Sequence, residues 1–594
     1  MDAHSVLHDV FGYSAFRPGQ EEIIQSLVAG DNLLAVMPTG AGKSLCYQIP
    51  AIMSERLTVV VSPLLALMDD QVAALRANGV GVAAIHSGVS RDDNIVKWQS
   101  VKSGECKLLY LSPERLMTSQ MLNALGKLKP ALFVVDEAHC ISKWGASFRP
   151  EYEQLSRLRD AFPDATICAF TATADKATRS DIAAKLFRGE GRVIVQGFDR
   201  PNLRLAVTTK ASWKDQLMTF LADKRGQPGI IYCLSRKFTD EVAVYLVGKG
   251  LNAIPYHAGQ TAEQRKINQD RFMSEGGVIM VATIAFGMGI DKGDIRYVCH
   301  LNLPGSLEAY YHEIGRAGRD GEPAETLLLY GLSDMALRRQ FIAQESASDE
   351  HKRREHKRLD ALLAFCEAAQ CRRIALLAYF DETSQPCGNC DNCLNPVEML
   401  DGTAHAQMVI ATIVRTGQFF GAIHIIDILR GANSQKILER RHHELPTHGA
   451  GKNQSKAYWQ SFIRQAVAAG YLSINVQKYG CLEVTATGRR VLSGEESFLF
   501  RAIGKAKSLP AAAKGKATPE LPEATAHLLS ILKRLRLTLA RERNVAAYII
   551  FPDSTLIEMA KQRPRTLDQM AAVNGVGPKK LQEFGLQFLR LTSA

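Results

Sequence analysis

A short glycine-rich stretch, Met37-Pro-Thr-Gly-Ala-Gly-Lys-Ser44, has the residue types of a phosphate-binding loop. Glycines 40 and 42 let backbone N–H groups approach phosphate oxygens. Lys43 would give a point charge to the β and γ phosphates, and Ser44 a ligand to Mg²⁺. A turn without function is the alternative, but an apolar run before the loop and a helical pattern after it supply the required strand-loop-helix context. Position 37 is Met where the general pattern has its first glycine. The residues expected to hold the nucleotide here are Thr39, Gly40, Gly42, Lys43 and Ser44.

Two adjacent carboxylates end the apolar run Leu132-Phe-Val-Val-Asp-Glu-Ala-His139. Asp136 can hold Mg²⁺ together with Ser44, and Glu137 can then orient and deprotonate the attacking water. His139 is better interpreted as a coupling residue than as a base. A surface acidic turn is the alternative, and the phosphate loop upstream argues against it. The two groups together indicate hydrolysis of a nucleoside triphosphate.

Two arginines, Arg316 and Arg319, stand three residues apart in the stretch 310–321. That spacing can present both guanidiniums to one side. An arginine aimed at a γ-phosphate neutralises charge that develops in the transition state, which is worth roughly 10³ to 10⁵ in rate. Surface salt bridges are the alternative role. Because these arginines belong to a later series of strands, we expect them to complete the site only when two domains close.

Short apolar runs alternate with helical patterns from residue 30 to about residue 330, which is typical of parallel α/β sheets, and the length suits two sheets in tandem. A boundary is expected near residues 197–213. The strands are expected at 32–37, 57–62, 107–111, 131–135 and 166–170, then at 229–233, 278–282, 297–302 and 326–330.

An aromatic segment, residues 140–152, follows the acidic motif directly. Trp144 and Phe148 offer stacking faces, and Lys143 and Arg149 offer cations. Base stacking contributes roughly 1–3 kcal/mol in proteins that bind single strands. Core packing is the common alternative for Trp and Phe, but the position beside the carboxylates favours a contact with nucleic acid.

These motifs together resemble the superfamily 2 helicases, and specifically the RecQ family of DNA helicases. The similarity covers nearly the whole chain and includes Thr171-Ala-Thr173, Gly315-Arg-Ala-Gly-Arg319 and the N-terminal segment 11–20. It implies that Arg17 and Gln20 contact adenine, which gives a preference for ATP. It also implies that segments 62–68 and 112–115 touch the tracking strand, and that segment 281–291 links the second domain to ATP and DNA. One departure is His312, where the family usually has glutamine.

The resemblance further implies 3′-to-5′ unwinding of DNA in recombination, repair and the SOS response. Single-stranded, forked and duplex DNA are the expected ligands, and a single-strand-binding protein is a candidate partner. An RNA helicase of the same superfamily and a non-catalytic DNA-binding scaffold are the alternatives. The cysteine and winged-helix modules argue against the first. The presence of Lys43, Glu137 and Arg319 argues against the second.

Four cysteines cluster at positions 371, 387, 390 and 393, with the spacing of a closed tetrahedral zinc site. Cys366 is a competing fourth ligand, but on a helix it would point roughly 140° away from Cys371. The Cys-Arg-Arg sequence at 371–373 matches the family, so the expected ligands of Zn²⁺ are Cys371, Cys387, Cys390 and Cys393. An iron-sulfur cluster remains an alternative.

The expected fold is therefore a multidomain α/β chain. It would contain two tandem RecA-like parallel-sheet domains, a helical zinc-binding subdomain, a winged helix and a C-terminal helical HRDC domain. In the winged helix, residues 455–469 would form the recognition-like helix and Tyr479 the hairpin tip, where it is a candidate wedge for strand separation. Basic residues of the last domain, including Arg534, Arg536, Lys579 and Lys580, are candidate DNA contacts. The expected boundaries are 1–203, 204–338, 339–400, 401–500, a linker at 501–523, and 524–594.

Composition agrees with this assignment. The net charge is +11, which suits a polyanionic partner such as nucleic acid. No apolar run approaches the roughly 18–20 residues of a membrane span, and no secretory signal is visible at the N-terminus. The other eight cysteines are scattered, as in a reducing compartment. The expected location is the bacterial cytoplasm, in association with the nucleoid.

Overall fold

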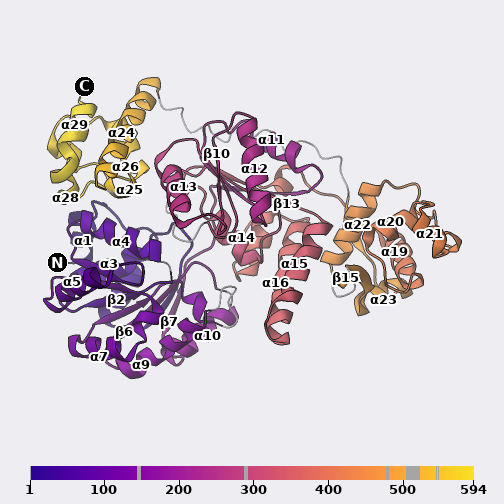
Figure 1. The fold of residues 1–594 in the computed structure, drawn as a ribbon, viewed down its shortest axis with the longest axis horizontal. Coiled ribbons are helices and arrows are strands. Elements are labelled where there is room, and N and C mark those ends of the chain that lie inside the picture. Colours follow the sequence, from indigo (N-terminus) through magenta and orange to yellow (C-terminus); the bar gives the residue numbers. More distant parts are fainter. Residues whose placement is uncertain are drawn as a thin grey trace.

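The structure is a computed structural model, and it describes residues 2–63, 65–142, 149–174, 176–286, 292–475, 480–502, 522–543, 545 and 547–593. Figure 1 shows two sheet domains side by side, a helical lobe at one end and the C-terminal helices packed near the N-terminus. Among the described residues, no helix is both long and apolar enough to cross a membrane.

The first domain is a seven-stranded sheet in the order β3-β4-β2-β5-β6-β1-β7, and its strands pair in parallel. Its inner strands are buried on both faces, as in sheets that helices cover on both sides. Leu34 and Val36 of one strand pack into one core cluster, and Leu33 and Ala35 into a second cluster across the sheet. The strands are β1 (Leu33–Val36), β2 (Thr58–Val61), β3 (Val82–Ile85), β4 (Leu108–Leu111), β5 (Leu132–Val135), β6 (Thr166–Thr171) and β7 (Arg192–Val195). The helices are α1 (Ala3–Asp9), α2 (Gln20–Ala29), α3 (Lys43–Met53), α4 (Leu65–Ala77), α5 (Arg91–Lys102), α6 (Pro113–Leu116), α7 (Ser119–Leu128), α8 (Pro150–Glu153), α9 (Leu158–Ala161) and α10 (Lys176–Phe187), with short 3₁₀ turns at Ala138–Ile141 and Gln154–Arg157.

The second domain is a six-stranded parallel sheet in the order β10-β11-β9-β12-β13-β8. The nine expected strands are all present in the two sheets. Four further strands, β3, β7, β8 and β10, were not expected, and β8 lies inside the segment expected as the boundary. The strands are β8 (Leu203–Thr209), β9 (Gly229–Tyr232), β10 (Ala253–Tyr256), β11 (Ile279–Ala282), β12 (Tyr297–His300) and β13 (Ala324–Tyr330). The helices are α11 (Trp213–Leu221), α12 (Arg236–Gly248), α13 (Ala262–Ser274) and α14 (Leu307–Ile314).

A cysteine module and a winged-helix unit follow the second sheet. Within the winged-helix unit, β15 and β16 form an antiparallel hairpin, while β14 and β17 pair at the two ends of the unit. The cysteine module contains α15 (Leu332–Gln344), α16 (Asp349–Glu367), α17 (Arg372–Tyr379) and α18 (Asp391–Leu394). The winged-helix unit contains β14 (Met399–Asp401), α19 (Thr403–Arg415), α20 (Ala422–Leu429), α21 (Gln435–Glu439), α22 (Lys456–Ala468), β15 (Leu472–Asn475), β16 (Cys481–Val484), α23 (Ala486–Ser493) and β17 (Leu499–Arg501), with a 3₁₀ turn at His442–Glu444.

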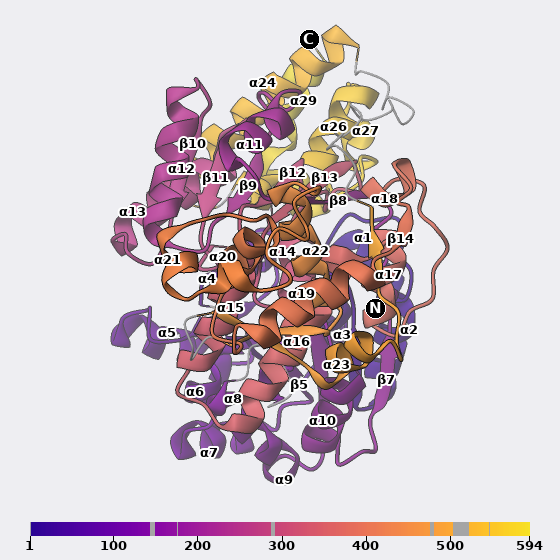
Figure 2. The same ribbon diagram turned by 90° about the vertical axis from the view of Figure 1, so that its right-hand side faces the viewer.

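The C-terminal helical unit has its own apolar core and packs against the first domain. The N–H of Gly575 donates to the carbonyl oxygen of Gly12 at 2.7 Å, and α25 contacts α4. Figure 1 places this unit beside α1 and away from the winged-helix unit, and Figure 2 shows it at the top of the molecule. It contains α24 (Glu523–Glu542), α25 (Ala547–Ile550), α26 (Asp553–Gln562), α27 (Leu567–Ala571), α28 (Pro578–Lys580), a π-helical turn (Leu581–Gly585) and α29 (Leu586–Thr592).

Candidate active site and metal centre

The phosphate loop lies between β1 and the start of α3. Gly40 and Gly42 have φ angles of 88° and 80°, which residues with a side chain rarely adopt. A Cβ at Gly42 would lie 2.5 Å from Nε2 of Gln20, so a side chain here would displace the Gln20 amide from the loop. Met37 still belongs to the extended segment, because its N–H donates to the carbonyl oxygen of Thr171 at 3.0 Å. The departure from the general pattern therefore falls at the end of the strand and not in the turn.

Arg17 and Gln20 both hold the phosphate loop. Nε2 of Gln20 donates to the carbonyl oxygens of Ala41 and Gly42, each at 3.1 Å, and Oε1 accepts the N–H of Arg17 at 2.8 Å. The Arg17 guanidinium donates to the carbonyl oxygen of Gly40. Both N–H groups of the Gln20 amide are thus used by the loop, and Oε1 keeps capacity for one more donor.

Asp136 and Glu137 directly follow β5, and they emerge at the sheet edge where the phosphate loop leaves β1. Glu137 has a φ of 49°, a left-handed conformation that costs about 1–3 kcal/mol and tends to occur at functional sites. Burial and the neighbouring Glu137 carboxylate raise the pKa of Asp136 to about 6. Burial also opposes ionisation of Glu137, but Lys43 holds the pKa of Glu137 below its ordinary value. Glu137 is therefore the firmly ionised carboxylate of the two, and it lies beside Lys43.

A chain of polar contacts leads from Glu137 across to the second domain. Nδ1 of His139 lies 3.3 Å from Oε2 of Glu137 and 3.0 Å from Oγ1 of Thr171. The Thr171 hydroxyl donates to the carbonyl oxygen of Thr173, whose own hydroxyl lies 3.1 Å from Nε2 of His312 on α14. Burial and the nearby His139 lower the pKa of His312 to about 3, so its ring is neutral. At this position, where the family usually has glutamine, histidine makes a hydrogen bond to Thr173.

Arg316 and Arg319 follow α14 and face the first domain. Arg316 is buried, and Arg319 packs on the phosphate loop: its Cγ lies 3.4 Å from where a Cβ on Gly40 would be. Burial raises the pKa of Tyr232 to about 12, and the positive charge of both arginines opposes that rise. Both guanidiniums thus lie near one buried hydroxyl, close to the interface of the two sheets.

Helix α14 is anchored from the side of the cysteine module. Oε1 of Glu308 accepts the Tyr379 hydroxyl at 2.5 Å and lies 3.6 Å from Nε of Arg358. The Tyr311 hydroxyl donates to the carbonyl oxygen of Phe198 at 2.8 Å. None of these contacts was expected from the sequence, because the partners belong to distant segments and no short motif joins them. The cysteine module therefore fixes the helix that carries His312 and leads to both arginines.

A single pocket of about 1050 Å³ collects these groups. The first domain supplies one wall, the arginine segment the opposite wall, and the C-terminal helical unit part of the rim. The contribution of the C-terminal unit to the rim of the pocket was not expected from the sequence. Residues that line the pocket include Arg17, Gln20, Thr39, Gly40, Gly42, Lys43, Ser44, Asp136, Glu137, His139, Arg149, Thr173, His312, Arg316 and Arg319, with Arg536, Tyr548 and Asp553 from the C-terminal unit.

The aromatic segment is only partly within the described residues. Trp144 and Phe148, together with Lys143, lie outside them, as does the end of segment 281–291. Arg149 is described: its guanidinium lies 3.4 Å from the carbonyl oxygen of Pro63, and it lines the pocket. Arg149 therefore connects the segment after the carboxylates with the Ser-Pro segment at 62–68.

The four clustered cysteines converge as a metal centre. Their sulfur atoms all lie within 4.8 Å of one another, with Cys371 3.5 Å from Cys387 and 3.9 Å from Cys390. Zn–S bonds of about 2.3 Å in a tetrahedron separate sulfurs by about 3.8 Å, so the set fits Zn²⁺. Burial opposes ionisation of Cys371, but the N–H of Cys387 and other donors lower the pKa of Cys371 to about 7. Cys366 is fully buried elsewhere and does not belong to the cluster.

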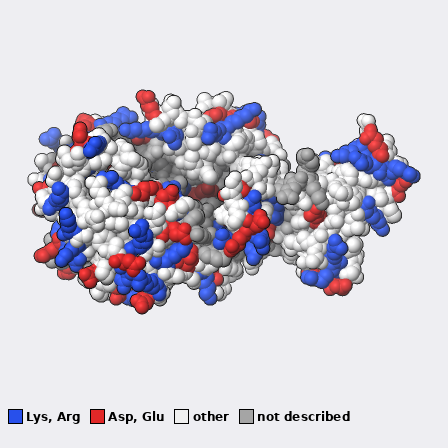
Figure 3. Space-filling view, turned by 60° about the horizontal axis from the view of Figure 1, so that its bottom comes forward, with Lys and Arg blue, Asp and Glu red and all other residues white. Residues whose placement is uncertain are grey.

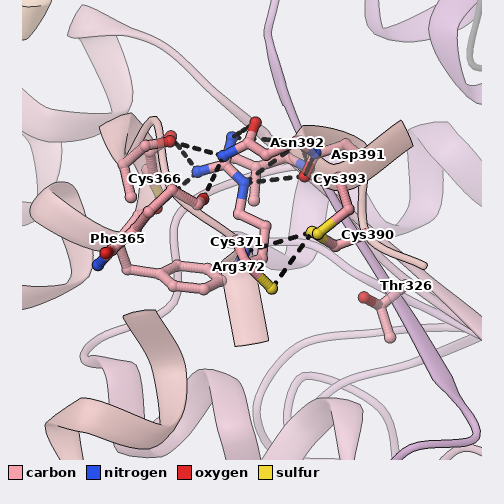
Figure 4. Close-up of polar contacts among 12 residues, drawn as sticks. Thr326, Phe365, Cys366, Cys371, Arg372, Cys390, Asp391, Asn392 and Cys393 are labelled. Carbon is pink, nitrogen blue, oxygen red and sulfur yellow. Dashed lines mark hydrogen bonds and ion pairs between the residues drawn. The ribbon is translucent and has the colours of Figure 1, made fainter. Parts of the chain in front are cut away.

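Arg372 follows the first of these cysteines and stabilises the cluster through hydrogen bonds (Figure 4). It is fully buried and donates to the carbonyl oxygens of Phe365 and Cys366 at 2.7 and 2.9 Å. Its Nε donates to Oδ1 of Asp391 at 2.9 Å, and its backbone N–H donates to Sγ of Cys390 at 3.3 Å. This network ties the end of α16 to the start of α18, which follows the third cysteine.

The helix expected to be recognition-like, α22, is mostly buried. Trp459 and Phe462 are fully buried, and Arg464 forms an ion pair with Glu367 of α16. Basic residues before α22 are exposed instead, and Figure 3 shows Lys and Arg side chains gathered on this lobe at the right-hand end. Tyr479 lies outside the described residues. The exposed basic residues of this lobe include Arg430, Lys436, Arg440, Arg441, Lys452 and Lys456.

Two of the basic residues expected to contact DNA in the C-terminal unit are buried. Arg536 pairs with Asp553 at 2.5 Å, and the Lys580 pKa is lowered to about 8 by burial. Arg534 and Lys579 are exposed, and Lys579 lies 3.6 Å from Glu583.

Five family models match successive parts of the chain. "DEAD/DEAH box helicase" matches residues 17–182, and "Helicase conserved C-terminal domain" matches residues 210–321. "RecQ zinc-binding" matches residues 332–394, "RQC domain" matches residues 396–508, and "HRDC domain" matches residues 526–592. The two sheets, the cysteine module, the winged-helix unit and the C-terminal unit each correspond to one of these models.

Relatives match this chain over nearly their whole length. A protein of Haemophilus influenzae named ATP-dependent DNA helicase RecQ is 43% identical, and the match covers 99% of this chain and 95% of the relative. Relatives with the same name from Pasteurella multocida and Bacillus subtilis are 42% and 36% identical over 99% of this chain, and over 93% and 98% of their own length.

Proposed function

The chain belongs to the RecQ family of ATP-dependent DNA helicases, and on that premise we propose that it converts ATP hydrolysis into 3′-to-5′ translocation along single-stranded DNA and unwinding of the duplex ahead. The observation that supports this most is the shared pocket. Its two walls come from two different sheets, so the relative position of the sheets can control hydrolysis. Recombination and repair are the processes that such an activity would serve.

In the proposed reaction, each wall of the pocket has its own task. Lys43 neutralises the β and γ phosphates, and Glu137 orients and deprotonates the attacking water. Arg316 and Arg319 neutralise charge that develops as the γ-phosphoryl group transfers. His139 and His312 relay the position of the second domain to Glu137 through the hydrogen-bonded threonines.

Ser44 and Asp136 fit a magnesium ion. Both line the pocket and offer oxygen atoms, which Mg²⁺ prefers. Burial and Glu137 raise the pKa of Asp136, and a divalent cation beside it would favour its ionised form. Such an ion would supply neutralisation of phosphate charge. Adenine selection is assigned to Arg17 and to the remaining acceptor capacity of Gln20.

The proposed DNA contacts lie on both sides of the motor. Arg149, with Trp144 and Phe148, would hold the single strand beside the pocket. The exposed basic residues of the winged-helix lobe would bind duplex or forked DNA through its phosphates, and Tyr479 would act at the tip of the β15–β16 hairpin. A single-strand-binding protein is the proposed protein partner, and the nucleoid the proposed location.

Each domain, with the boundaries expected from the sequence, has its own proposed role. Residues 1–203 and 204–338 form the motor, and 339–400 form the zinc module that anchors α14. Residues 401–500 bind duplex DNA, and 524–594 form the HRDC domain, joined through 501–523.

Unwinding of a forked DNA duplex, measured together with ATP hydrolysis, tests this function. We expect wild-type hydrolysis to be stimulated by single-stranded DNA and to drive unwinding only from a 3′ tail. Lys43→Ala should abolish both activities, while Lys102→Ala, an exposed lysine of the same domain, should leave both unchanged. Equal stimulation by RNA would favour an RNA helicase, unwinding by Lys43→Ala would refute the assigned site, and DNA binding without hydrolysis would indicate a scaffold.

A further inference from the structure

Arg200 occupies the segment that joins the two sheets. It lies between β7, the last strand of the first sheet, and β8, the first strand of the second sheet. The Tyr311 hydroxyl fixes this segment through the carbonyl oxygen of Phe198. The guanidinium of Arg200 is thereby aimed into the interface between the phosphate loop and the arginine segment.

The Arg200 guanidinium reaches carbonyl oxygens of both domains at once. Nη1 donates to the carbonyl oxygen of Thr39 in the phosphate loop at 2.9 Å and lies 3.4 Å from that of Gly315. Nη2 donates to the carbonyl oxygens of Ala317 and Gly318 at 2.9 and 2.8 Å. The Arg200 side chain therefore links the phosphate loop to backbone carbonyl groups on both sides of Arg316.

Only a planar, multiply donating group can make this set of contacts. Guanidinium carries five N–H donors in a fixed fork and stays charged, whereas the lysine ammonium is a compact point charge. The Gly318 carbonyl also accepts the side-chain amide of Asn202 at 2.9 Å, so the turn before Arg319 is held from two sides. The geometry of that turn sets where the Arg319 side chain leaves the backbone.

We propose that Arg200 is a positioning residue for catalysis: it fixes the arginine segment against the phosphate loop, so that Arg316 and Arg319 reach the transferring phosphoryl group. This inference rests on the proposed function. Arg200 itself does not line the pocket that holds the substrate. It acts through the backbone of residues 315–318, and a displacement of about 1 Å in such a segment can cost on the order of 10²-fold in rate.

The test separates positioning from general stability. In Arg200→Ala we expect kcat for DNA-stimulated ATP hydrolysis to fall roughly 10- to 100-fold with KM for ATP nearly unchanged. Affinity for ADP with aluminium fluoride, which mimics the transferring phosphoryl group, should fall by a similar factor, while affinity for ADP alone should not. Arg200→Lys should recover only part of the loss. Arg192→Ala, at an arginine of β7 that contacts the first domain alone, serves as the matched control.

Combined variants make the test sharper. If Arg200 acts through Arg316 and Arg319, then Arg200→Ala added to Arg316→Ala with Arg319→Ala should slow ATP hydrolysis no further. Multiplied losses, or equal losses of affinity for ADP and for the fluoride complex, would overturn the positioning role. A wild-type protein without Lys43-dependent hydrolysis would instead refute the proposed function, so the two failures are distinguishable.

Discussion

At the scale of single residues, His312 makes the stability of the protein depend on pH, which a glutamine at this position would not do. Its ring stands between Thr173 and His139 at the domain interface, and the nearby charges are those of Glu137, Lys43, Arg316 and His139. Burial lowers its pKa from 6.5 to about 3. The folded protein therefore binds fewer protons at this site than the unfolded chain does between these two pH values.

The sign of the resulting pH dependence follows from proton linkage. A histidine whose folded pKa is lowered contributes its full stability above pH 6.5 and loses it as the pH falls toward 3. At pH 5.5 the loss is about 1.4 kcal/mol. We expect His312→Gln to lose less thermal stability than wild type when the pH falls from 7.5 to 5.5, as measured by the midpoint of thermal unfolding. Identical losses in the two proteins would contradict the neutral, buried ring.

Residues with chemistry in their type and spacing could be proposed from the sequence alone. Lys43, Glu137 and Arg319 line one pocket, and Cys371, not Cys366, lies in the cysteine cluster. Arg200 and Glu308 could not be identified in this way, because they bond to backbone or to distant side chains and belong to no short motif. The burial of Arg536 and Lys580 was also not visible, since charge alone does not tell which side of a helix packs.

At the scale of elements, the four strands that were not expected from the sequence all lie at the edges of the two sheets. β3 and β7 are the two edges of the first sheet, and β8 and β10 are the two edges of the second. Inner parallel strands are buried on both faces and form continuous apolar runs, whereas edge strands need not. β10 even contains Pro255, which an edge strand tolerates.

Another element-scale feature is the joint between α16 and α22. Arg464 and Glu367 form a nearly fully buried ion pair, and the guanidinium lies 5.3 Å from the centre of the Tyr330 ring. This contact joins the zinc module, the winged helix and strand β13 of the second sheet. Removal of one partner from such a pair leaves an uncompensated buried charge.

We expect Arg464→Met to destabilise this joint by about 3–5 kcal/mol, because Glu367 would remain buried without its partner. The double variant Arg464→Met with Glu367→Leu should recover most of that loss. Hydrogen exchange of the α22 amides reports the change locally. If the single and double variants exchange alike, the pair does not hold the joint together.

At the scale of the whole molecule, the HRDC domain forms part of the rim of the nucleotide pocket. Asn574 and Tyr548 line it, and Lys533 lies 3.9 Å from Asp294 of the second sheet. Gly577 packs tightly against the first domain: a Cβ there would lie 2.8 Å from the carbonyl oxygen of Val10. The sequence could predict that this domain exists but not where it packs, because packing joins two independently folded surfaces.

Gly577→Val should undock the HRDC domain without unfolding it. The φ angle of Gly577 is −75°, so valine strains only the interface. We expect a larger radius of gyration in X-ray scattering and an unchanged helical signal in circular dichroism. Gly248→Val, where a new Cβ meets open space, is the control. An unchanged radius in Gly577→Val would mean that the domain does not pack here in solution.

The proposed hydrolytic site is divided between two sheets, and we expect DNA to control how the two sheets meet. Single-turnover ATP hydrolysis by Arg319→Ala, with and without single-stranded DNA, tests it most directly, with Arg225→Ala as an exposed control in the same domain. A divided site predicts that Arg319→Ala still binds ATP and DNA but loses the stimulated rate by roughly 10³-fold or more. Full stimulation by DNA in Arg319→Ala would contradict it.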